Sequence, residues 1–522
     1  MAWAPACAAI RMPLARWLCN CSRAGARQAF RRIGGKEKRV MRFALWLLLP
    51  AVLAAAAEPL FQVVDIDAGK VEKVRVGGKT VEVKLLSTGE DRDRVRSAIR
   101  QARADVEING SRATLVCGNY RLPVSVGGVE VDCAVTKAYY SNSNADPWGL
   151  VKDARLRLWP VRSAFMPPGS FVYPVRQVWF ASRTQMANEP TYVDEGERIG
   201  AERIYYHSGL DIGGAEGLTE VVAATAGVVV QLGKAVLPAH RDAPLDNRYD
   251  RMSVLDERGW YHRYMHLQSF DPAVKLGEPV RMGEKIGTLG KEGDSGGWSH
   301  LHYEIVGKQP SGKWGTVEGY AFLWEAWQRQ ARPGVIACAR PHVAALTGER
   351  VRLDASCSWS RDPKNAHYEW TFSDGSKASG AVVDRTYAQP GTYSEILKVT
   401  DAGNGVSWDF MTVNVLDPSH PDQVPPAIHA VYWPTMDLKP GRAITFKVRT
   451  FGTTHGEEVW NFGDGSPETA TRSDGNVEPH APNGYAVTRH AFAKPGDYLV
   501  RVERADALGR KATAHLHVRV ER

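Results

Sequence analysis

The sequence predicts a mainly β protein, and two observations carry that prediction. Between residues 58 and 330, short runs of alternating apolar and polar residues are separated by turns that contain glycine. Beyond residue 334, one tryptophan-containing signature occurs twice, which indicates a repeated β unit. With 522 residues and 43% apolar content, the chain is long enough for three or four domains with separate cores.

The segment that ends at Ala57 has the pattern of a secretory signal peptide. Basic residues precede an apolar run from Phe43 to Leu53, and an alanine-rich stretch closes the segment. We expect translation from Met41, cleavage after Ala57 and export to the periplasm or the cell exterior. The apolar run is short for a membrane span, so no stable membrane insertion is expected after cleavage; a retained anchor is the alternative.

The charge of the chain changes with this cleavage. The formal charge of +8 for the whole chain would favour a nucleic-acid or membrane partner. Residues 1–57, the N-terminal extension and signal peptide, hold ten basic residues and one acidic residue, and the remainder has 56 basic against 57 acidic residues. A nearly neutral protein predicts no nucleic-acid partner.

Four of the seven cysteines follow the cleavage site, in two local pairs. Cys117 pairs with Cys133, and Cys338 with Cys357. In an oxidising compartment we expect two disulfides, since neither pair has the spacing of a zinc site. Four free buried thiols are the alternative.

Residues 58–160 are predicted to form a β-rich accessory domain. Glycine-containing dipeptides at 77–78, 109–110 and 127–128 lie between alternating runs, as the two-residue turns of β-hairpins do. The domain contains no catalytic motif. Its role stays open among a substrate-binding module, a cover over an active site and a spacer.

One helix is expected inside this accessory domain, from Glu90 to Ala102. Ser87 and Glu90 have the spacing of a capping box. The apolar residues that would share one face of this helix are Val95, Ala98, Ile99 and Ala102.

Residues 161–330 are predicted to form a second domain rich in strands, after a connector with several prolines. The strand-like runs are 221–231, 252–255, 260–266, 285–289 and 300–306, and a helix is expected at 320–330. Two segments, 181–199 and 235–251, have no regular pattern. They are candidates for the walls of a binding site, or for mere surface.

The C-terminal part contains the internal repeat. The signature Trp-x-Phe-x-Asp-Gly-Ser starts at Trp370 and again at Trp460, and each copy is followed by Pro-Gly-x-Tyr. Both copies, at 334–417 and 426–522, resemble the polycystic kidney disease (PKD) domain, an immunoglobulin-like β-sandwich. The resemblance predicts that the tryptophan and phenylalanine point into the core. The proline-rich linker 417–426 is predicted to act as a semi-rigid spacer.

Histidines and one aspartate recur in three short motifs of the central domain. The motifs are His207-Ser-Gly-Leu-Asp211, Tyr264-Met-His266-Leu267 and His300-Leu-His302-Tyr303-Glu304. Imidazoles and a carboxylate are ligands that zinc prefers, and a catalytic zinc takes three protein ligands and keeps a fourth position open. Residues two apart on a strand share a face, so His300 and His302 can face one cleft. In a strand, the spacing of His207 and Asp211 would also put both on one face.

A His-x-His triplet alone is weak evidence. His515-Leu-His517 near the C-terminus has the same pattern, and we interpret it as surface strand. The triplet at His300 differs from the one at His515 because two further motifs with possible metal ligands occur in the same domain.

Residues 200–310 resemble the lysostaphin-type zinc endopeptidases of the M23 family, on the three motifs quoted above. The resemblance implies an antiparallel-sheet metallopeptidase domain and one zinc ion per chain, bound by His207, Asp211 and His302. It also implies His266 and His300 as catalytic histidines; which of them is the general base stays open. Zinc with an open position polarises a peptide carbonyl and activates water, and unligated histidines can move the protons.

The resemblance also implies a substrate class. The usual substrates of the family are the peptide stems or bridges of bacterial peptidoglycan, and some relatives cut glycine-rich proteins instead. An extracellular protein substrate, a catalytically inactive cell-wall binding or regulatory module, and an adhesin with structural zinc are the alternatives. All five motif positions are filled, which favours an active peptidase. The oligomeric state stays open.

Several neighbouring residues have two interpretations. Glu304 could hydrogen-bond a metal ligand or merely pack, and Trp298 could line the groove or pack. His262 shares the predicted strand face of Tyr264 and His266, and is the rival of His266. The histidines interpreted as solvated are His240, His455, His480 and His490.

Overall fold

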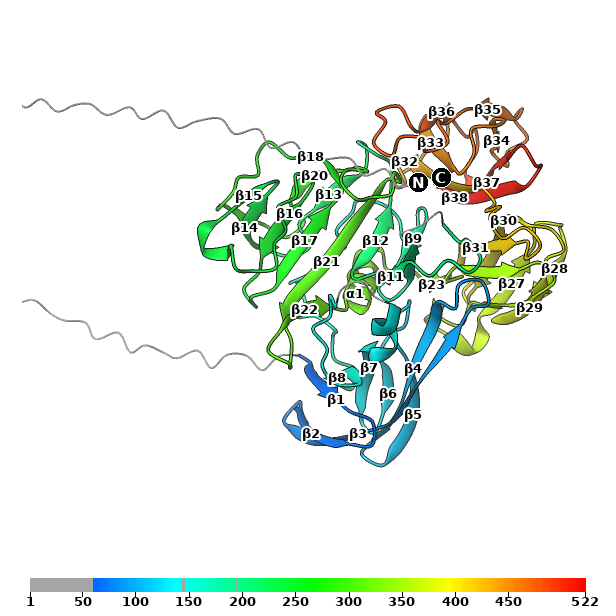
Figure 1. Ribbon diagram of the computed structural model, residues 1–522. Coiled ribbons are helices and arrows are strands. Elements are labelled where there is room, and N and C mark those ends of the chain that lie inside the picture. Colours follow the sequence, from blue (N-terminus) through cyan, green and yellow to red (C-terminus); the bar gives the residue numbers. More distant parts are fainter. Residues whose placement is uncertain (1–59, 143–145, 193–195) are drawn as a thin grey trace, which may run out of the picture. The chain divides into compact units, whose positions relative to one another are not determined.

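The computed structural model describes residues 60–142, 146–192 and 196–522, and these residues form mainly antiparallel β-sheets (Figure 1). The predicted fold class is confirmed. The predicted signal peptide lies outside the described residues. Along the described part of the chain, no helix is both long and apolar enough to cross a bilayer.

The accessory part contains two four-stranded sheets. Their strand orders are β1-β8-β7-β6 and β2-β3-β4-β5. The three predicted hairpin turns are confirmed, since two-residue turns join β2 to β3, β4 to β5 and β6 to β7. The strands are β1 (Gln62–Ile66), β2 (Val71–Val76), β3 (Lys79–Arg92), β4 (Ile99–Ile108), β5 (Ser111–Val116), β6 (Val124–Val126), β7 (Val129–Thr136) and β8 (Ala154–Pro160), with a 3-10 turn η1 (Lys137–Asn142).

The predicted helix from Glu90 to Ala102 is wrong. β3 runs through Arg92, a turn follows, and β4 starts at Ile99. From Ala102 to Ile108 every second residue is fully buried, which is the period of a strand. β3 pairs with β4 along this stretch, so the long-range ladder outweighs the local capping-box signal.

A nine-stranded sheet forms the centre of the chain. Its order is β15-β14-β16-β17-β21-β12-β9, with β19 on β14 and β22 on β21. Its strands are β9 (Thr184–Gln185), β12 (Leu210–Gly213), β14 (Gly227–Leu232), β15 (Ala235–Val236), β16 (Met252–Leu255), β17 (Tyr261–Met265), β19 (Pro279–Val280), β21 (His300–Lys308) and β22 (Trp314–Val317). The other elements are the pair β10 (Pro190–Tyr192) and β11 (Ile204–Tyr206), the sheet of β13 (Glu220–Val222), β20 (Lys285–Leu289) and β18 (Leu267–Phe270), a turn η2 (Pro238–His240) and helix α1 (Tyr320–Ala331).

Most strand runs predicted for this region are confirmed. β16 and β20 have the predicted bounds, and β17, β21 and α1 differ from the predictions by one or two residues at an end. The run 221–231 is interrupted, because β13 and β14 belong to different sheets. Between them, the N–H of Ala224 donates to the hydroxyl of Tyr264 at 2.7 Å, so this stretch joins no ladder.

The two repeats form β-sandwiches. Trp370 and Trp460 are fully buried, each in the same core as the phenylalanine two residues later, as the PKD resemblance implies. The first repeat contains β23 (Val335–Ile336), β24 (Val343–Leu346), β25 (Arg350–Asp354), β26 (Trp359–Ser360), η3 (Pro363–Asn365), β27 (His367–Thr371), β28 (Lys377–Ser379), β29 (Val382–Thr386), β30 (Gly391–Thr400) and β31 (Val406–Leu416). The second contains β32 (Ala427–Trp433), β33 (Ile444–Phe451), β34 (Glu458–Asn461), β35 (Thr469–Thr471), β36 (Ala486–His490), β37 (Gly496–Ala505) and β38 (Lys511–Val520).

One sheet runs through both sandwiches. Its order is β24-β31-β30-β38-β37-β34-β35, and Thr392 of β30 pairs in parallel with Ala512 of β38. The prediction that residues 417–426 act as a spacer is therefore wrong, because backbone pairing joins the units that the linker was expected to separate. Residues 422–425 of the linker instead line a cavity described below.

The same seam corrects the interpretation of His515 and His517 as surface residues. The ring of His515 lies 3.0 Å from the hydroxyl of Ser394 through Nδ1, and the ring centroid of His517 is 4.4 Å from that of Trp408. Both histidines are half-buried, because β38 lies against the first sandwich.

The four cysteines are free thiols, so the two predicted disulfides are not formed in this structure. The fold nevertheless brings each predicted pair together. Cys117 lies opposite Cys133 in an isolated bridge, and the Sγ atoms of Cys338 and Cys357 are 2.9 Å apart. Burial raises the pKa of the Cys117 and Cys338 thiols well above the usual range, which favours the neutral thiol.

Candidate metal centre

Two neighbouring strands bring Asp211, His300 and His302 onto one face of the central sheet. Asp211 of β12 pairs with His302 of β21, and His302 pairs on its other side with Met265 of β17. One step along, Gly213 pairs with His300. Directly opposed residues point to the same face, so Asp211, His300 and His302 share it.

His207 reaches the same point from a turn. It follows β11, and Gly209 at φ +85° reverses the chain into β12, so His207 and Asp211 come together through a turn and not through the alternation of one strand. A side chain at position 209 would meet the carbonyl oxygen of Tyr303 at 2.7 Å. Glycine is therefore required both for the left-handed conformation and for the close approach to β21.

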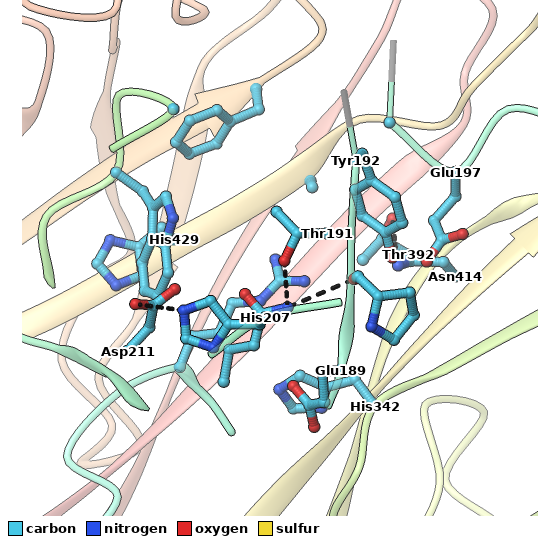
Figure 2. Close-up of a pocket in the computed structure, with 18 of the residues that line it drawn as sticks. Glu189, Thr191, Tyr192, Glu197, His207, Asp211, His342, Thr392, Asn414 and His429 are labelled. Atoms are coloured by element: carbon cyan, nitrogen blue, oxygen red, sulfur yellow. Dashed lines mark hydrogen bonds and ion pairs between the residues drawn. The ribbon is translucent and has the colours of Figure 1, made fainter. Parts of the chain in front are cut away.

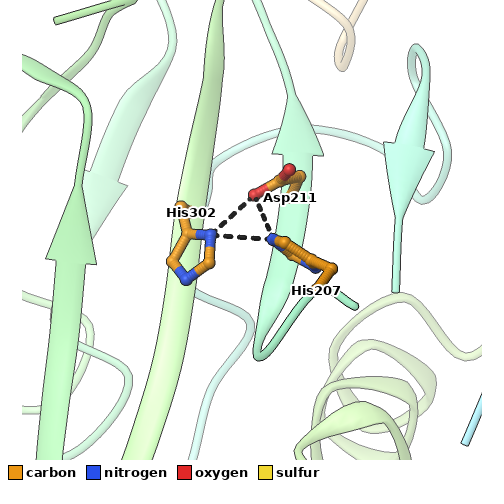
Figure 3. Close-up of side chains that lie close together, drawn as sticks. All are labelled: His207, Asp211 and His302. Carbon is orange, nitrogen blue, oxygen red and sulfur yellow. Dashed lines mark hydrogen bonds and ion pairs between the residues drawn. The ribbon is translucent and has the colours of Figure 1, made fainter. Parts of the chain in front are cut away.

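The three predicted ligands converge on one point (Figure 3). His207 Nε2 lies 2.9 Å from His302 Nδ1 and 3.1 Å from Asp211 Oδ1, and His302 Nδ1 lies 2.9 Å from the same oxygen. A tetrahedron with zinc–ligand bonds of about 2.05 Å has edges of roughly 3.3 Å, so this triangle is close to the size that zinc requires.

The protonation of these ligands also suits a metal. His207 Nδ1 lies 3.2 Å from the carbonyl oxygen of Met186, which only accepts, so the ring proton sits on Nδ1 and the Nε2 lone pair is free. Burial lowers the pKa of His302 to about 4, which keeps its imidazole neutral. Burial would raise the pKa of Asp211, but the neighbouring His207 and His300 hold it well below its usual range. Burial alone would lower the pKa of His207, but the neighbouring Asp211 raises it, so a metal would take the place of a proton on this ring. Two imidazoles and a carboxylate are a donor set that fits zinc.

His266 joins this face through a backbone irregularity. β17 ends at Met265, and His266 has φ +64°, so its ring lies on the face of the ligands instead of continuing the strand alternation. The ring centroid of His266 is 4.6 Å from that of His300 and 6.0 Å from that of His302. The prediction that His266 shares a face with His262 is therefore wrong.

His262 lies in the core, away from the ligands. It is fully buried, and its ring lies between the hydroxyl of Tyr303 at 2.7 Å and the carboxylate of Asp256 at 3.1 Å. The geometry thus separates the two rivals: His266 is beside the ligands, and His262 is a structural residue.

Asp250 holds His266 in place, and sequence reasoning missed it. Asp250 Oδ2 accepts the backbone N–H of His266 at 3.1 Å and lies 3.2 Å from its Nδ1. Nδ1 is also 2.6 Å from the carbonyl oxygen of Glu292, so the Nδ1 proton is engaged and Nε2 is left as an acceptor. Asp250 belongs to the segment 235–251, which carries no motif, so only the fold could reveal it.

His300 is oriented in a similar way. Its Nδ1 lies 3.0 Å from the carbonyl oxygen of Trp298, and its Nε2 lies 3.4 Å from Asp211 Oδ1. The indole of Trp298 stacks on the imidazole at 3.9 Å between centroids and also lines the adjacent cavity. Trp298 therefore has both of the roles between which the sequence could not choose.

Glu304 does not contact the ligands among the described residues. Its carboxylate accepts hydrogen bonds from Arg263 at 2.9 Å and from the hydroxyl of Thr316 at 2.7 Å. Of the two interpretations of this residue, the structure favours packing and strand pairing.

The four histidines interpreted as solvated behave differently from one another. His455 is exposed, and His480 is exposed but lies 2.6 Å from the carbonyl oxygen of Gly293. For the other two the interpretation is wrong: His240 lies 3.0 Å from the hydroxyl of Tyr261, and His490 stacks on Phe462 at 4.0 Å between centroids.

The site opens into a cavity of about 920 Å³ (Figure 2). The segment 181–199, predicted as a possible wall, lines it with Glu189, Thr191 and Tyr192. Both sandwiches contribute as well, through His342 of the first and His429 of the second. The other patternless segment, 235–251, does not line the cavity among the described residues, and its part in the site is the support from Asp250.

Comparisons with known proteins agree with this geometry. The model of peptidase family M23 matches residues 205–312, and two PKD domain models match residues 331–415 and 430–520. Csd3 of Helicobacter pylori is 14% identical, over 47% of this chain and 82% of that chain, with a TM-score of 0.18. A zinc-containing peptidase of Vibrio cholerae is 15% identical, over 43% and 82%, with a TM-score of 0.19.

A further likeness concerns the sandwiches. The fibronectin(III)-like modules of Clostridium thermocellum CbhA are 11% identical, over 36% of this chain and 94% of that chain, with a TM-score of 0.15. With TM-scores this low, the structural likenesses carry no argument. Residues 205–312 match peptidase family M23, and two segments that match PKD domains follow them.

Proposed function

We propose that the protein is an exported zinc-dependent endopeptidase that hydrolyses peptide bonds in the stems or bridges of peptidoglycan. One observation carries the proposal: the ligand atoms of His207, Asp211 and His302 form a triangle of zinc size, with the rings of His266 and His300 beside it at the wall of a large cavity. A structural zinc site takes four protein ligands, whereas only these three are gathered within the described residues.

A bound zinc would polarise the scissile carbonyl and activate the attacking water. The two unligated histidines would move the protons. Each has its Nδ1 proton held by a main-chain carbonyl, Glu292 for His266 and Trp298 for His300, so each offers Nε2 to the reaction. One can accept a proton from water and the other can stabilise the oxyanion or protonate the leaving amine.

The shape of the site supports a peptide substrate. The cavity has walls from the loop 181–199, from both sandwiches and from the linker, and it is lined by both polar and apolar groups. A site of this size accommodates several residues of an extended chain. A glycine-rich extracellular protein is the second candidate substrate, and digestion experiments on both substrates distinguish it from peptidoglycan.

The test is digestion of purified peptidoglycan sacculi by residues 58–522, followed by mass spectrometry of the soluble products, with and without a zinc chelator. We expect chelator-sensitive release of fragments cut within the stems or bridges. His207→Ala and His300→Ala should abolish the release, and His455→Ala, which changes an exposed histidine, should not.

Intact sacculi would exclude the wall-hydrolase proposal for this form of the protein. The same variants would then be tested on elastin-like and other glycine-rich proteins. Binding to sacculi without cleavage of either substrate would identify an inactive cell-wall module instead.

A further inference from the structure

A guanidinium group lines the active-site cavity without a partner. Three arginines line it, and two of them are neutralised: Arg100 by Asp93 and Glu197, and Arg510 by Asp506. Arg183 makes no hydrogen bond and no ion pair through its side chain with any residue that the structure describes. It is half-buried, so its charge is only partly solvated.

Unpartnered arginines are costly in such a place. A guanidinium has five N–H donors, and taking it out of water without an anion is unfavourable. Burial accordingly lowers the pKa of Arg183. Glu189 and Glu197 are near enough to act on it through space, but neither comes within ion-pair distance of it.

The sheet register places Arg183 beside the catalytic groups. Gln185 pairs with Asp211, and the N–H of Gly213 donates to the carbonyl oxygen of Arg183 at 3.0 Å. Gly213 pairs on its other side with His300. The backbones of Arg183, Gly213 and His300 therefore lie in one row. Arg183 immediately precedes β9, and its side chain lines the same cavity as the metal ligands.

This row sets the distance between Arg183 and the catalytic histidine His300. Adjacent strands lie about 4.8 Å apart, so the backbones at Arg183 and His300 are about 10 Å apart, which is roughly three residues of extended peptide. Position 213 is glycine, and the imidazole of His429 lies within 3.0 Å of the place where its Cβ would be. The hydroxyl of Ser182 and the ring of His429 thus fill the space beside Gly213, and burial lowers the pKa of His429 well below the usual range, so this ring is neutral.

We infer that Arg183 binds a carboxylate of the substrate within about three residues of the scissile bond, and so determines specificity for acidic peptides. This inference rests on the proposed function and adds a substrate feature to it. A planar guanidinium binds a carboxylate through two parallel hydrogen bonds, which fixes the register of the chain as well as adding affinity. The carboxylate can belong to a side chain or to the C-terminus of the peptide.

The test uses the zinc-loaded protein, residues 58–522, and cross-linked stem peptides purified from sacculi in three forms. One form has all carboxylates free, one has only the C-terminal carboxylate amidated, and one has only the side-chain carboxylates amidated. Arg183→Gln should lower kcat/KM for the free acid about 10- to 100-fold, mainly through KM. It should have no effect on whichever amidated form lacks the recognised carboxylate, and that form identifies the source. Arg183→Lys should restore part of the loss.

Two controls keep the result interpretable. Arg176→Gln removes an exposed cation that pairs with Glu220, and it should leave all three peptides unaffected. The midpoint of thermal unfolding should not fall in Arg183→Gln, because the side chain has no partner to lose among the described residues and its burial is itself unfavourable. An equal loss on the acid and on both amidated forms, or no loss on any, would overturn the inference.

Binding measured by isothermal titration calorimetry separates this inference from the proposed function. If wild-type protein binds the free acid more tightly than the amidated form but cleaves neither, the proposed function fails and the role of Arg183 stands. If it cleaves all forms and binds them equally, the proposed function stands and the role of Arg183 is refuted.

Discussion

The backbone N–H of Ser299 donates a hydrogen bond to the hydroxyl of Tyr485 at 2.7 Å. Ser299 immediately precedes His300, whereas Tyr485 belongs to the second sandwich, 186 residues further along the chain. Arg449, also in that sandwich and fully buried, donates to the carbonyl oxygen of Gly297 at 2.6 Å. The second sandwich therefore holds the segment that delivers His300 to the site.

Removing the Tyr485 hydroxyl tests this support. Tyr485→Phe leaves the buried N–H of Ser299 without an acceptor, which costs about 1–3 kcal/mol, and it also removes the contact of this hydroxyl with His429 Nδ1 at 2.7 Å. We expect kcat on peptidoglycan fragments to fall more than KM rises, because the orientation of His300 is disturbed. Tyr498→Phe is the matched control, since its exposed hydroxyl bonds only the carbonyl of Lys494 in the same sandwich. Equal kcat for the two variants would show that the hydrogen bond between Ser299 and Tyr485 plays no part in catalysis.

Asp250 should matter for activity mainly through His266, although it also pairs with Arg248 at 2.8 Å. In Asp250→Asn the charge that accepts the His266 N–H and faces its Nδ1 is lost, and kcat should fall about 10- to 100-fold, as for other residues that orient reactive histidines. Zinc content, measured by mass spectrometry of the native protein, should stay at one ion per chain. Asp294→Asn provides the control, because Arg248 pairs with both Asp250 and Asp294, and Asp294 is exposed. Loss of zinc in Asp250→Asn would contradict the assigned role.

Zinc should stabilise the folded protein through the three ligands. At a free zinc concentration of about 100 times Kd, binding adds about 2.7 kcal/mol to the free energy of unfolding. The midpoint of thermal unfolding of the chelator-treated protein should therefore rise on adding zinc. Asp211→Asn and His302→Ala should abolish this rise, and His455→Ala should keep it. A zinc-induced rise that survives in all three variants would place the ion elsewhere.

The seam between the sandwiches should respond to acid through His515. Burial lowers the pKa of His515 to about 4, with Arg501 acting in the same direction. Below the ordinary pKa of about 6.5, His515 binds a proton in the unfolded chain but not in the folded protein. The contribution of His515 to the free energy of unfolding is therefore constant above that pH and falls as the pH drops toward 4. Because the ring is only half-buried, the loss is about 2 kcal/mol at most.

The matching variant is His515→Gln, which keeps a polar partner for Ser394 and cannot titrate. Its urea unfolding midpoint should fall less than that of the wild type between pH 6.5 and 4. Parallel pH profiles for the two proteins would show that other groups cause the acid sensitivity.

Local patterns in the sequence were reliable where neighbours along the chain decide the structure. The hairpin turns at 77–78, 109–110 and 127–128 are confirmed. A two-residue turn depends on the backbone conformation of its own residues, and glycine and asparagine favour that conformation. The strand at 252–255 is confirmed as well. The helix predicted at Glu90 failed, because its capping signal competed with a ladder formed by residues that are distant in sequence.

By itself, the sequence determined which residues are candidates for the metal site and that two similar sandwiches follow it, since motif spacing and repetition are one-dimensional properties. Only the tertiary structure decided that His266 rather than His262 faces the ligands, because a single residue at φ +64° reverses the strand alternation. It likewise decided that Asp250, Arg183 and Tyr485 belong to the same site. Their contacts depend on strand register and on packing between distant segments, and no local pattern encodes these.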